Sequence, residues 1–288
     1  MAISRNSDES GSLCELEAHI RKIGWEAPEL TEIEIFHELT KLRRSSIRKM
    51  GRRIGGYLND PRALRETAAN FKTYAGAEKV VLPPPPRLTA AFDQVLSDRR
   101  STRLFDGRPL TAEEVSAVLS SCRVTRRAQS SLAPDLELRF RPYPSGGGLY
   151  PTEIYVALTN VTGLPACLAH YGANEHALSV LAPLPPLSHL AGTLGDHNGH
   201  TGGIGMIVFV SILPERTVVK YGYRGYRLAM MEVGMVPFGL SLAATAAGLA
   251  NLHWGGYFDD EVNSMLNLDG VTETVSACLF IGRSPEHE

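Results

Sequence analysis

The spacing of hydrophobic and polar positions divides the chain into a helical first part and a mixed second part. From Leu13 to Glu66 apolar residues recur at helical intervals and few strand-forming residues interrupt them. Four consecutive prolines, Pro83–Pro86, then exclude both a helix and a central strand. We therefore expect a helical N-terminal extension with a linker over residues 1–82, followed by a main domain over residues 83–288.

The main domain alternates helix-like and strand-like segments. A helix is predicted to end near Ser121, and Thr111 followed by Ala112, Glu113 and Glu114 supplies its N-cap and acidic first turn. A long apolar helix is expected at Leu228–Ala250. Strands are predicted at Leu136–Phe140, Glu153–Leu158, Ile204–Leu213 and Val275–Ile281. The third strand is almost wholly apolar, as in a strand buried on both faces. The pattern indicates an α+β fold with one main sheet.

Composition excludes several classes of protein. Hydrophobic residues make up 43% and charged residues 21% of the 288 residues, as in folded globular proteins. The net charge of -2 gives no global field for a polyanion, so we expect no nucleic-acid partner. The first residues lack an apolar signal segment, which favours a cytoplasmic protein. Four cysteines without a C-x-x-C pair are then expected to be reduced thiols: Cys14, Cys122, Cys167 and Cys278.

Met230–Tyr257 is long and apolar enough for a bilayer helix. However, it contains Pro237, several glycines and the small-residue stretch Ala243–Gly248, which suits close packing inside protein. We expect a buried core helix or a subunit-interface helix, and no membrane span.

A basic run in the N-terminal extension has two interpretations. It contains seven cations with no intervening acid: Lys41, Arg43, Arg44, Arg48, Lys49, Arg52 and Arg53. It is either a solvated helix face or a binding surface for an acidic peptide, a carrier protein or a cofactor phosphate.

Two motifs in the main domain are compatible with a nucleotide. Arg99-Arg100-Ser101-Thr102-Arg103 offers guanidinium and hydroxyl donors for a phosphate, or it begins a surface helix. Pro144–Pro151 contains three consecutive glycines, which favour either the close approach of a flat ligand or a mobile loop. The chain has no P-loop, and no G-x-G-x-x-G follows a strand, which disfavours ATP and dinucleotide folds.

Two further motifs flank the long apolar helix. In Lys220–Arg227 an ammonium next to a phenol is expected to lower the phenol's pKa and make it a proton acceptor, unless the tyrosines simply pack at a helix start. The pair Gly255-Gly256 lies between aromatic residues. His197 and His200 have no third ligand at a recognisable spacing, so no metal site is expected.

Together and in this order, the motifs resemble the FMN-dependent nitroreductase-like superfamily, and within it the SagB-type dehydrogenases, or azoline oxidases. The resemblance covers roughly Phe92 to Arg283 and includes the Lys220-Tyr221 pair, which ordinary nitroreductases do not share. It implies a nitroreductase-like fold, in which helices sandwich a mixed, mainly antiparallel sheet. It also implies a homodimer with FMN at the interface.

The resemblance also implies site residues. The phosphate, ribityl chain and ring edge of FMN would be held by Arg99, Arg100, Ser101 and Arg103, with Arg283 at the phosphate. The loop Pro144, Ser145, Gly146 and Gly147 would approach the isoalloxazine from the partner subunit, and Gly255 and Gly256 would lie near the ring. Lys220 and Tyr221 would be catalytic.

The implied reaction is the oxidation of thiazoline or oxazoline rings to thiazoles or oxazoles in a peptide or carrier-protein-bound intermediate. Tyr221, activated by Lys220, would accept a proton while a hydride passes to FMN, which dioxygen then reoxidises. The alternatives are an NAD(P)H-dependent nitro or quinone reductase, another flavin dehydrogenase on the same fold, and a flavin-free scaffold subunit.

Overall fold

The computed structural model describes residues 30–69 and 71–285, which belong to two compact units. In the first unit, which ends at Arg43, the described residues form helix α2 (Leu30–Thr40). The second unit starts at Arg44 and contains α3 (Ile47–Leu58) and α4 (Pro61–Ala68) together with the main sheet. The predicted helical character is therefore confirmed from residue 30 onward, whereas residues 13–29 of that prediction lie outside the described residues.

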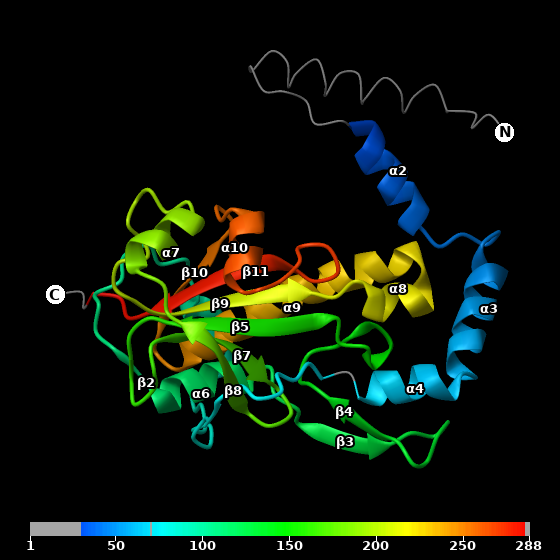
Figure 1. Ribbon diagram of the computed structural model, residues 1–288, viewed down its shortest axis with the longest axis horizontal. Helices are drawn as coiled ribbons and strands as arrows, with labels where there is room; N and C mark the ends of the chain where they lie inside the picture. The colour runs from blue at the N-terminus through cyan, green and yellow to red at the C-terminus, as the bar shows by residue number, and fades with distance from the viewer. Residues whose placement is uncertain (1–29, 70, 286–288) are drawn as a thin grey trace. The chain divides into compact units, whose positions relative to one another are not determined.

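The second unit is built on a seven-stranded sheet with the order β1-β8-β7-β5-β9-β11-β10 (Figure 1). Every pair of neighbouring strands in it is antiparallel. The strands are β1 (Lys79–Val81), β5 (Thr152–Leu158), β7 (Cys167–Gly172), β8 (Ala177–Pro183), β9 (Ile204–Ile212), β10 (Ala250–Trp254) and β11 (Thr274–Gly282). Two small sheets accompany it: the parallel pair β2 (Leu110–Thr111) and β6 (Val161–Thr162), and the antiparallel pair β3 (Arg126–Gln129) and β4 (Glu137–Phe140).

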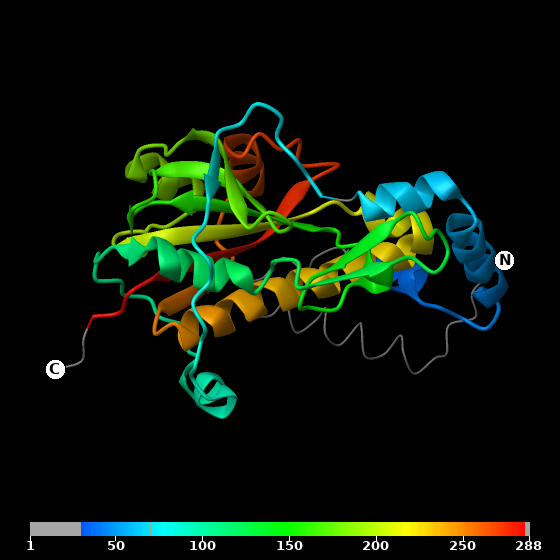
Figure 2. The same ribbon diagram turned by 90° about the horizontal axis from the view of Figure 1, so that it is seen from below.

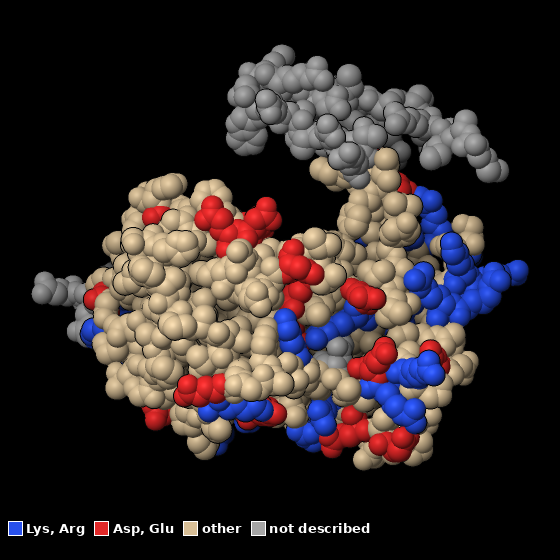
Figure 3. Space-filling view, viewed as in Figure 1, with Lys and Arg blue, Asp and Glu red and all other residues tan. Residues whose placement is uncertain are grey.

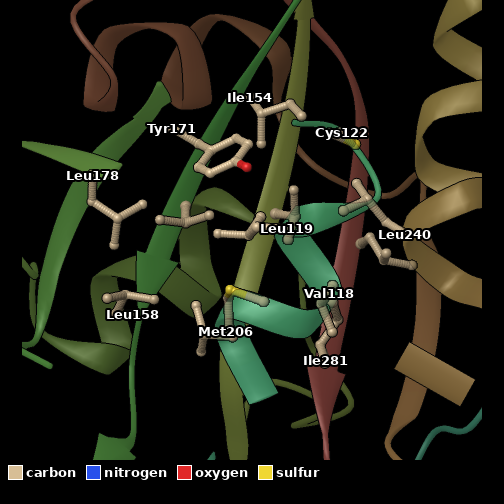
Figure 4. Close-up of a cluster of buried hydrophobic side chains, with 14 of the residues drawn as sticks. Val118, Leu119, Cys122, Ile154, Leu158, Tyr171, Leu178, Met206, Leu240 and Ile281 are labelled. Atoms are coloured by element: carbon tan, nitrogen blue, oxygen red, sulfur yellow. The ribbon is translucent and has the colours of Figure 1, made fainter. Parts of the chain in front are cut away.

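Helices cover both faces of the main sheet, as expected for the nitroreductase-like fold. One hydrophobic cluster joins the sheet to α6 (Ala112–Ser120) and α9 (Tyr223–Ala246). Figure 4 shows part of this cluster, with Leu119 of α6 and Leu240 of α9 gathered around strand residues such as Met206. A second cluster joins the opposite face to α7 (Leu187–Thr193) and α10 (Asp259–Met265). The remaining helices are α5 (Phe92–Asp98) and α8 (Glu215–Tyr221).

Most predicted elements of the main domain are confirmed. Thr111 accepts a hydrogen bond from the backbone of Glu114, whose side chain accepts from the backbone of Thr111, so α6 begins with a complete capping box. The predicted strands correspond to β4, β5, β9 and β11, and every residue of β9 is buried. The proline run is neither helix nor strand.

The bounds of the long apolar helix differ from the prediction at both ends. Helix α9 already begins at Tyr223, because Gly222 turns the chain there with φ 59° and ψ −147°. It ends at Ala246, and Ala250 is the first residue of β10. Within the described ranges α9 is the single helix long and apolar enough to cross a membrane, and half of its most apolar window is buried in the protein. That burial suits a core helix.

Candidate active site

Lys220 and Tyr221 are the last two residues of α8, directly before the glycine turn that leads into α9. The dihedral angles of Gly222 lie in a region that essentially only glycine occupies. The turn therefore fixes the direction in which α8 ends. Helices α8 and α9 pack against each other, so the Lys–Tyr pair lies on a rigid element and not on a mobile loop.

The glycine loop meets this pair in space. Gly147 lies in the short 3-10 turn η1 (Gly146–Gly148) and has φ 70°. A Cβ atom at Gly147 would lie 2.4 Å from Oη of Tyr221 and 2.9 Å from Nζ of Lys220. Both polar side-chain atoms therefore converge on one point above Gly147. We call Gly146, Gly147, Lys220 and Tyr221 the Lys–Tyr site.

Helix α3 supports the same site. Nζ of Lys220 lies 5.2 Å from the ring centroid of Tyr57 and 5.4 Å from that of Tyr221, so the ammonium contacts two aromatic rings. Nε of Arg53 donates to the carbonyl oxygen of Val219 at 3.0 Å and so satisfies a carbonyl in the last turn of α8. The sequence places Arg53 in the basic run but does not link it or Tyr57 to the Lys220-Tyr221 pair, because no local pattern connects α3 to a residue 166 positions further along the chain.

The pKa shifts of the pair differ from the expected ones. Burial lowers the pKa of Lys220, whose side chain is largely enclosed. Burial raises the pKa of Tyr221, and the neighbouring Tyr57 phenol adds to this rise. The expected lowering of the phenol pKa is thus not found, because the ammonium lies over the ring face and no hydrogen bond joins it to the hydroxyl. Lys220 is the member of the pair that is more easily neutral, while the Tyr221 hydroxyl keeps its proton.

Polar contacts hold the loop that presents Gly147. Oγ of Ser145 accepts a hydrogen bond from the backbone of Tyr150 at 2.8 Å, and Oη of Tyr150 accepts from the backbone of Arg141 at 2.9 Å. Below the loop, Glu232 of α9 is buried and accepts from Oγ1 of Thr152 at 2.7 Å. Pro144, at the start of the loop, is exposed.

The arginine motif lies along the outer edge of β10. Ser101 pairs with Asn251 in parallel, and the backbone of Thr102 donates to the carbonyl of Asn251 at 2.9 Å. Nδ1 of His200 donates to the carbonyl of Arg103 at 3.0 Å, and the His200 ring packs edge-on against Trp254. Trp254 immediately precedes Gly255-Gly256. We call Arg99–Arg103 and Gly255-Gly256 the arginine edge.

The arginine edge fits a phosphate and a flat ring. Across the described ranges, no ion-pair partner is recorded for the guanidinium groups of Arg99, Arg100 and Arg103. Such unpaired guanidinium forks suit phosphate oxygens. A Cβ atom at Gly255 would meet nothing within 4 Å, so its backbone faces open space. The residues present therefore suit FMN at this edge.

Arg283 is differently placed from the other arginines. Its Nη2 donates to both carboxylate oxygens of Glu114, at 2.6 and 2.7 Å, and its Nε donates to the carbonyl of Pro109 at 3.2 Å. This residue therefore ties the end of β11 to the start of α6. Its phosphate contact stays a prediction from the resemblance.

The Lys–Tyr site and the arginine edge lie at opposite ends of α9. Gly146 abuts Leu228 near the start of α9, while Oγ of Ser241, near its end, donates to the side chain of Asn251. At roughly 1.5 Å per residue, Leu228 and Ser241 are about 20 Å apart along the helix axis. The structure thus brings each group of predicted residues together, but it does not bring the two groups together within one chain.

The described residues contain no cluster suited to a metal ion. Over residues 30–69 and 71–285, no group of three or more His, Cys, Asp or Glu side chains is placed to hold a metal ion. His200 instead holds the arginine motif beside Trp254.

Sequence comparison agrees with this architecture. The sequence model of the nitroreductase family matches residues 96–283, about two thirds of the chain. The chain belongs to the nitroreductase family. Proteins of this family are oxidoreductases, and the fold and the enzyme class expected from the sequence are thereby confirmed.

The relatives of this chain include a protein named for microcin processing and one named as a nitroreductase. The chain is 33% identical to the Microcin B17-processing protein McbC of Escherichia coli over 154 residues, which cover 52% of this chain and 57% of McbC. It is 30% identical to a candidate nitroreductase of Methanocaldococcus jannaschii, MJ1384, over 62% of this chain and 84% of that protein. The chain spans just over half the length of McbC. The similarity to McbC supports the SagB-type branch that the sequence motifs indicated.

Solved structures agree on the fold. A chain of the E. coli microcin synthetase McbBCD complex with truncated pro-MccB17 bound matches with a TM-score of 0.55 and 24% identity, covering 80% of this chain and 96% of that chain.

Proposed function

We propose that this member of the nitroreductase family is an FMN-dependent azoline dehydrogenase. It would oxidise thiazoline or oxazoline rings, held in a peptide or carrier-protein-bound intermediate, to thiazoles or oxazoles. The observation that carries the proposal is the convergence of Lys220 Nζ and Tyr221 Oη on Gly147, in the loop expected to approach the flavin. The similarity to a protein named for microcin processing supports it.

The oxidation removes one hydride and one proton from the azoline ring, and aromatisation of the ring drives it. FMN, when bound, supplies the two-electron acceptor for the hydride. The lowered pKa of Lys220 makes its neutral amine the proton acceptor, while the Tyr221 hydroxyl donates a hydrogen bond that orients the ring. Gly147 leaves space for both side chains, and the enclosure of the Lys220 side chain keeps bulk water from its amine.

A homodimer would complete the site. One flavin ring cannot contact Gly147 and Gly255 of the same chain, because α9 separates them. Exposed apolar side chains lie along α9, including Met230, Met231 and Phe238, and Phe92 of α5 is also exposed. Figure 2 shows α9 and α5 on one face of the second unit. A second copy packed on this face would supply the missing half of each site.

The proposed setting is a reducing cytoplasm. The described cysteines, Cys122, Cys167 and Cys278, are free and buried, and Cys14 lies outside the described residues.

In the proposed reaction dioxygen reoxidises the reduced FMN, so the enzyme would not need a nicotinamide cofactor.

The test uses the FMN-reconstituted protein and a synthetic peptide that contains one thiazoline ring. Loss of two hydrogens from the peptide, followed by mass spectrometry, is the expected result. Tyr221→Phe should bind FMN normally but turn over far more slowly, because the orienting hydroxyl is removed. Unchanged turnover in Tyr221→Phe would remove this residue from the mechanism.

A reductase is the second candidate, favoured by the similarity to MJ1384. Stopped-flow absorbance distinguishes the two functions. Rapid bleaching of the flavin by NADPH, without any azoline present, would replace the dehydrogenase proposal by an NAD(P)H-dependent nitro or quinone reductase.

A further inference from the structure

We propose that the basic face of α3 binds an acidic polypeptide segment that carries the substrate and presents it to the Lys–Tyr site. The basic face consists of Arg48, Lys49 and Arg52, which are exposed, with Arg53 at its inner edge. Figure 3 shows Lys and Arg side chains gathered over α3. The identity of the bound substrate rests on the proposed function, whereas the binding surface itself does not.

The arrangement of the cations indicates a binding surface. Arg48 and Arg52 are four residues apart, as are Lys49 and Arg53, so the cations form two neighbouring columns on the helix. No acidic residue occurs from Arg44 to Leu58, and the structure records no ion-pair partner for the four cations among the residues that it describes. Like charges at this spacing destabilise a helix. An acidic partner would relieve that repulsion.

The packing of α3 favours a polypeptide partner over a lipid surface. Helix α3 packs on α8, and its inward residues Ile54 and Tyr57 are half-buried. These two inward side chains are therefore engaged within the protein and are not available to insert into a bilayer. The net charge of -2 gives no extended positive field of the kind that holds nucleic acid.

The basic face leads directly to the Lys–Tyr site. Arg53 donates to Val219, and a Cβ atom at Gly222 would lie 3.3 Å from Nη1 of Arg53. One helical turn further along α3, Tyr57 contacts the ammonium of Lys220. A polypeptide segment bound along the two cation columns of α3 would therefore end about one helical turn from Tyr57, which contacts Lys220.

Fluorescence anisotropy tests the binding surface with the full-length, FMN-reconstituted protein. The probe is a fluorescein-labelled peptide of alternating glutamate and glycine, and the same peptide with glutamine is the neutral control. We expect the acidic probe to bind, more weakly as salt is added. The variant R48E/K49E/R52E should lose at least tenfold in affinity. R48K/K49R/R52K, which keeps every charge, should bind as the unmodified protein does.

Three results would overturn the proposal. The first is an affinity for the acidic peptide that R48E/K49E/R52E leaves unchanged. The others are tighter binding of a single-stranded thymidine oligonucleotide, or of phosphatidylserine vesicles, through the same three residues. Circular dichroism and thermal unfolding of both variants show that the comparison is made between folded proteins.

A kinetic comparison separates this proposal from the proposed function. One thiazoline peptide carries an acidic extension and a second carries the neutral one. The R48E/K49E/R52E variant should lose kcat/KM for the acidic substrate only, through KM. An equal loss of kcat/KM on the acidic and the neutral substrate would show that these residues have a structural role, and it would overturn the proposal. If neither peptide is oxidised, the anisotropy result still decides the binding surface.

Discussion

Lys220 and Tyr221 are neighbours in the chain, yet burial moves their pKa values in opposite directions. A cationic ammonium loses solvation when enclosed, so the pKa of Lys220 falls, and an anionic phenolate loses it too, so the pKa of Tyr221 rises. Both shifts favour the uncharged pair, in which an amine accepts a proton and a phenol keeps one.

The pH profile tests this assignment. Because the folded-state pKa of Lys220 lies below the ordinary value of 10.5, kcat should rise with pH and level off below that value. The unfolded chain binds the proton more tightly, so stability should also rise with pH between the folded and unfolded pKa values. Lys220→Arg should lose most turnover and the associated inflection, because a guanidinium stays charged. A Lys220→Arg enzyme with the same inflection would contradict the assignment.

Two glycines provide a matched pair of substitutions. Gly147→Ala should lower kcat strongly and cost about 1–3 kcal/mol, because the new Cβ collides with the Tyr221 hydroxyl at a positive φ. Gly255→Ala should leave the unfolding free energy nearly unchanged, since its Cβ meets nothing, but should lower FMN occupancy. Urea unfolding and the flavin-to-protein absorbance ratio measure both effects. If Gly147→Ala lost FMN and Gly255→Ala kept it, the flavin would have to be assigned to the Gly147 loop and not to the arginine edge.

The elements predicted correctly are those whose pattern is local. Thr111 and Glu114 cap α6 within four residues of sequence, and β9 is apolar along its whole length. Strands β7 and β10 were not predicted because each contains a buried polar residue that a partner on another helix or strand satisfies. His170 lies 2.9 Å from Glu153, and Asn251 bonds to Ser241 of α9. Polar residues in those positions break the pattern on which a strand prediction depends.

The candidate site was predictable as motifs but not as an arrangement. The glycine loop and the Lys220-Tyr221 pair were each visible in the sequence, whereas their meeting at Gly147 depends on how β5, α8 and α9 pack. Arg53 and Tyr57 gave no sign of their contacts with α8, because nothing in a helix sequence specifies a partner so distant in the chain.

The capping box of α6 should be measurable as stability. Thr111→Ala removes the hydroxyl that accepts from the backbone of Glu114 and should cost about 1 kcal/mol. Thr111→Ser keeps an equivalent acceptor and should cost only a small part of that. Urea unfolding monitored by circular dichroism measures the difference. Equal stability of the alanine and serine variants would show that this cap contributes nothing.

At the scale of the whole molecule, the two halves of the proposed site require two chains. Met231→Glu and Phe238→Glu place charges on the exposed apolar side of α9, where burial of an unpaired carboxylate opposes association. The double variant should be monomeric by analytical ultracentrifugation and should retain little FMN. Glu113→Gln on α6 serves as a surface control. A monomeric variant with full FMN occupancy would mean that one chain suffices to hold the flavin.

The near-neutral net charge of the chain conceals an uneven distribution. Cations gather on α3 and in the Arg99–Arg103 segment. In the proposed enzyme these groups have different tasks: the first holds an acidic polypeptide, and the second holds a phosphate. The two binding events should therefore respond to salt independently.

The segment at Ser101 and Thr102 also has a protective consequence. It pairs with Asn251 on the outer side of β10, which is otherwise the last strand of the main sheet. An uncovered outer strand is a template for intermolecular pairing and aggregation. If FMN phosphate holds the same segment in place, bound FMN should protect the edge strand from intermolecular pairing. On heating, flavin-depleted protein should then aggregate, measured as light scattering, at a lower temperature than FMN-loaded protein.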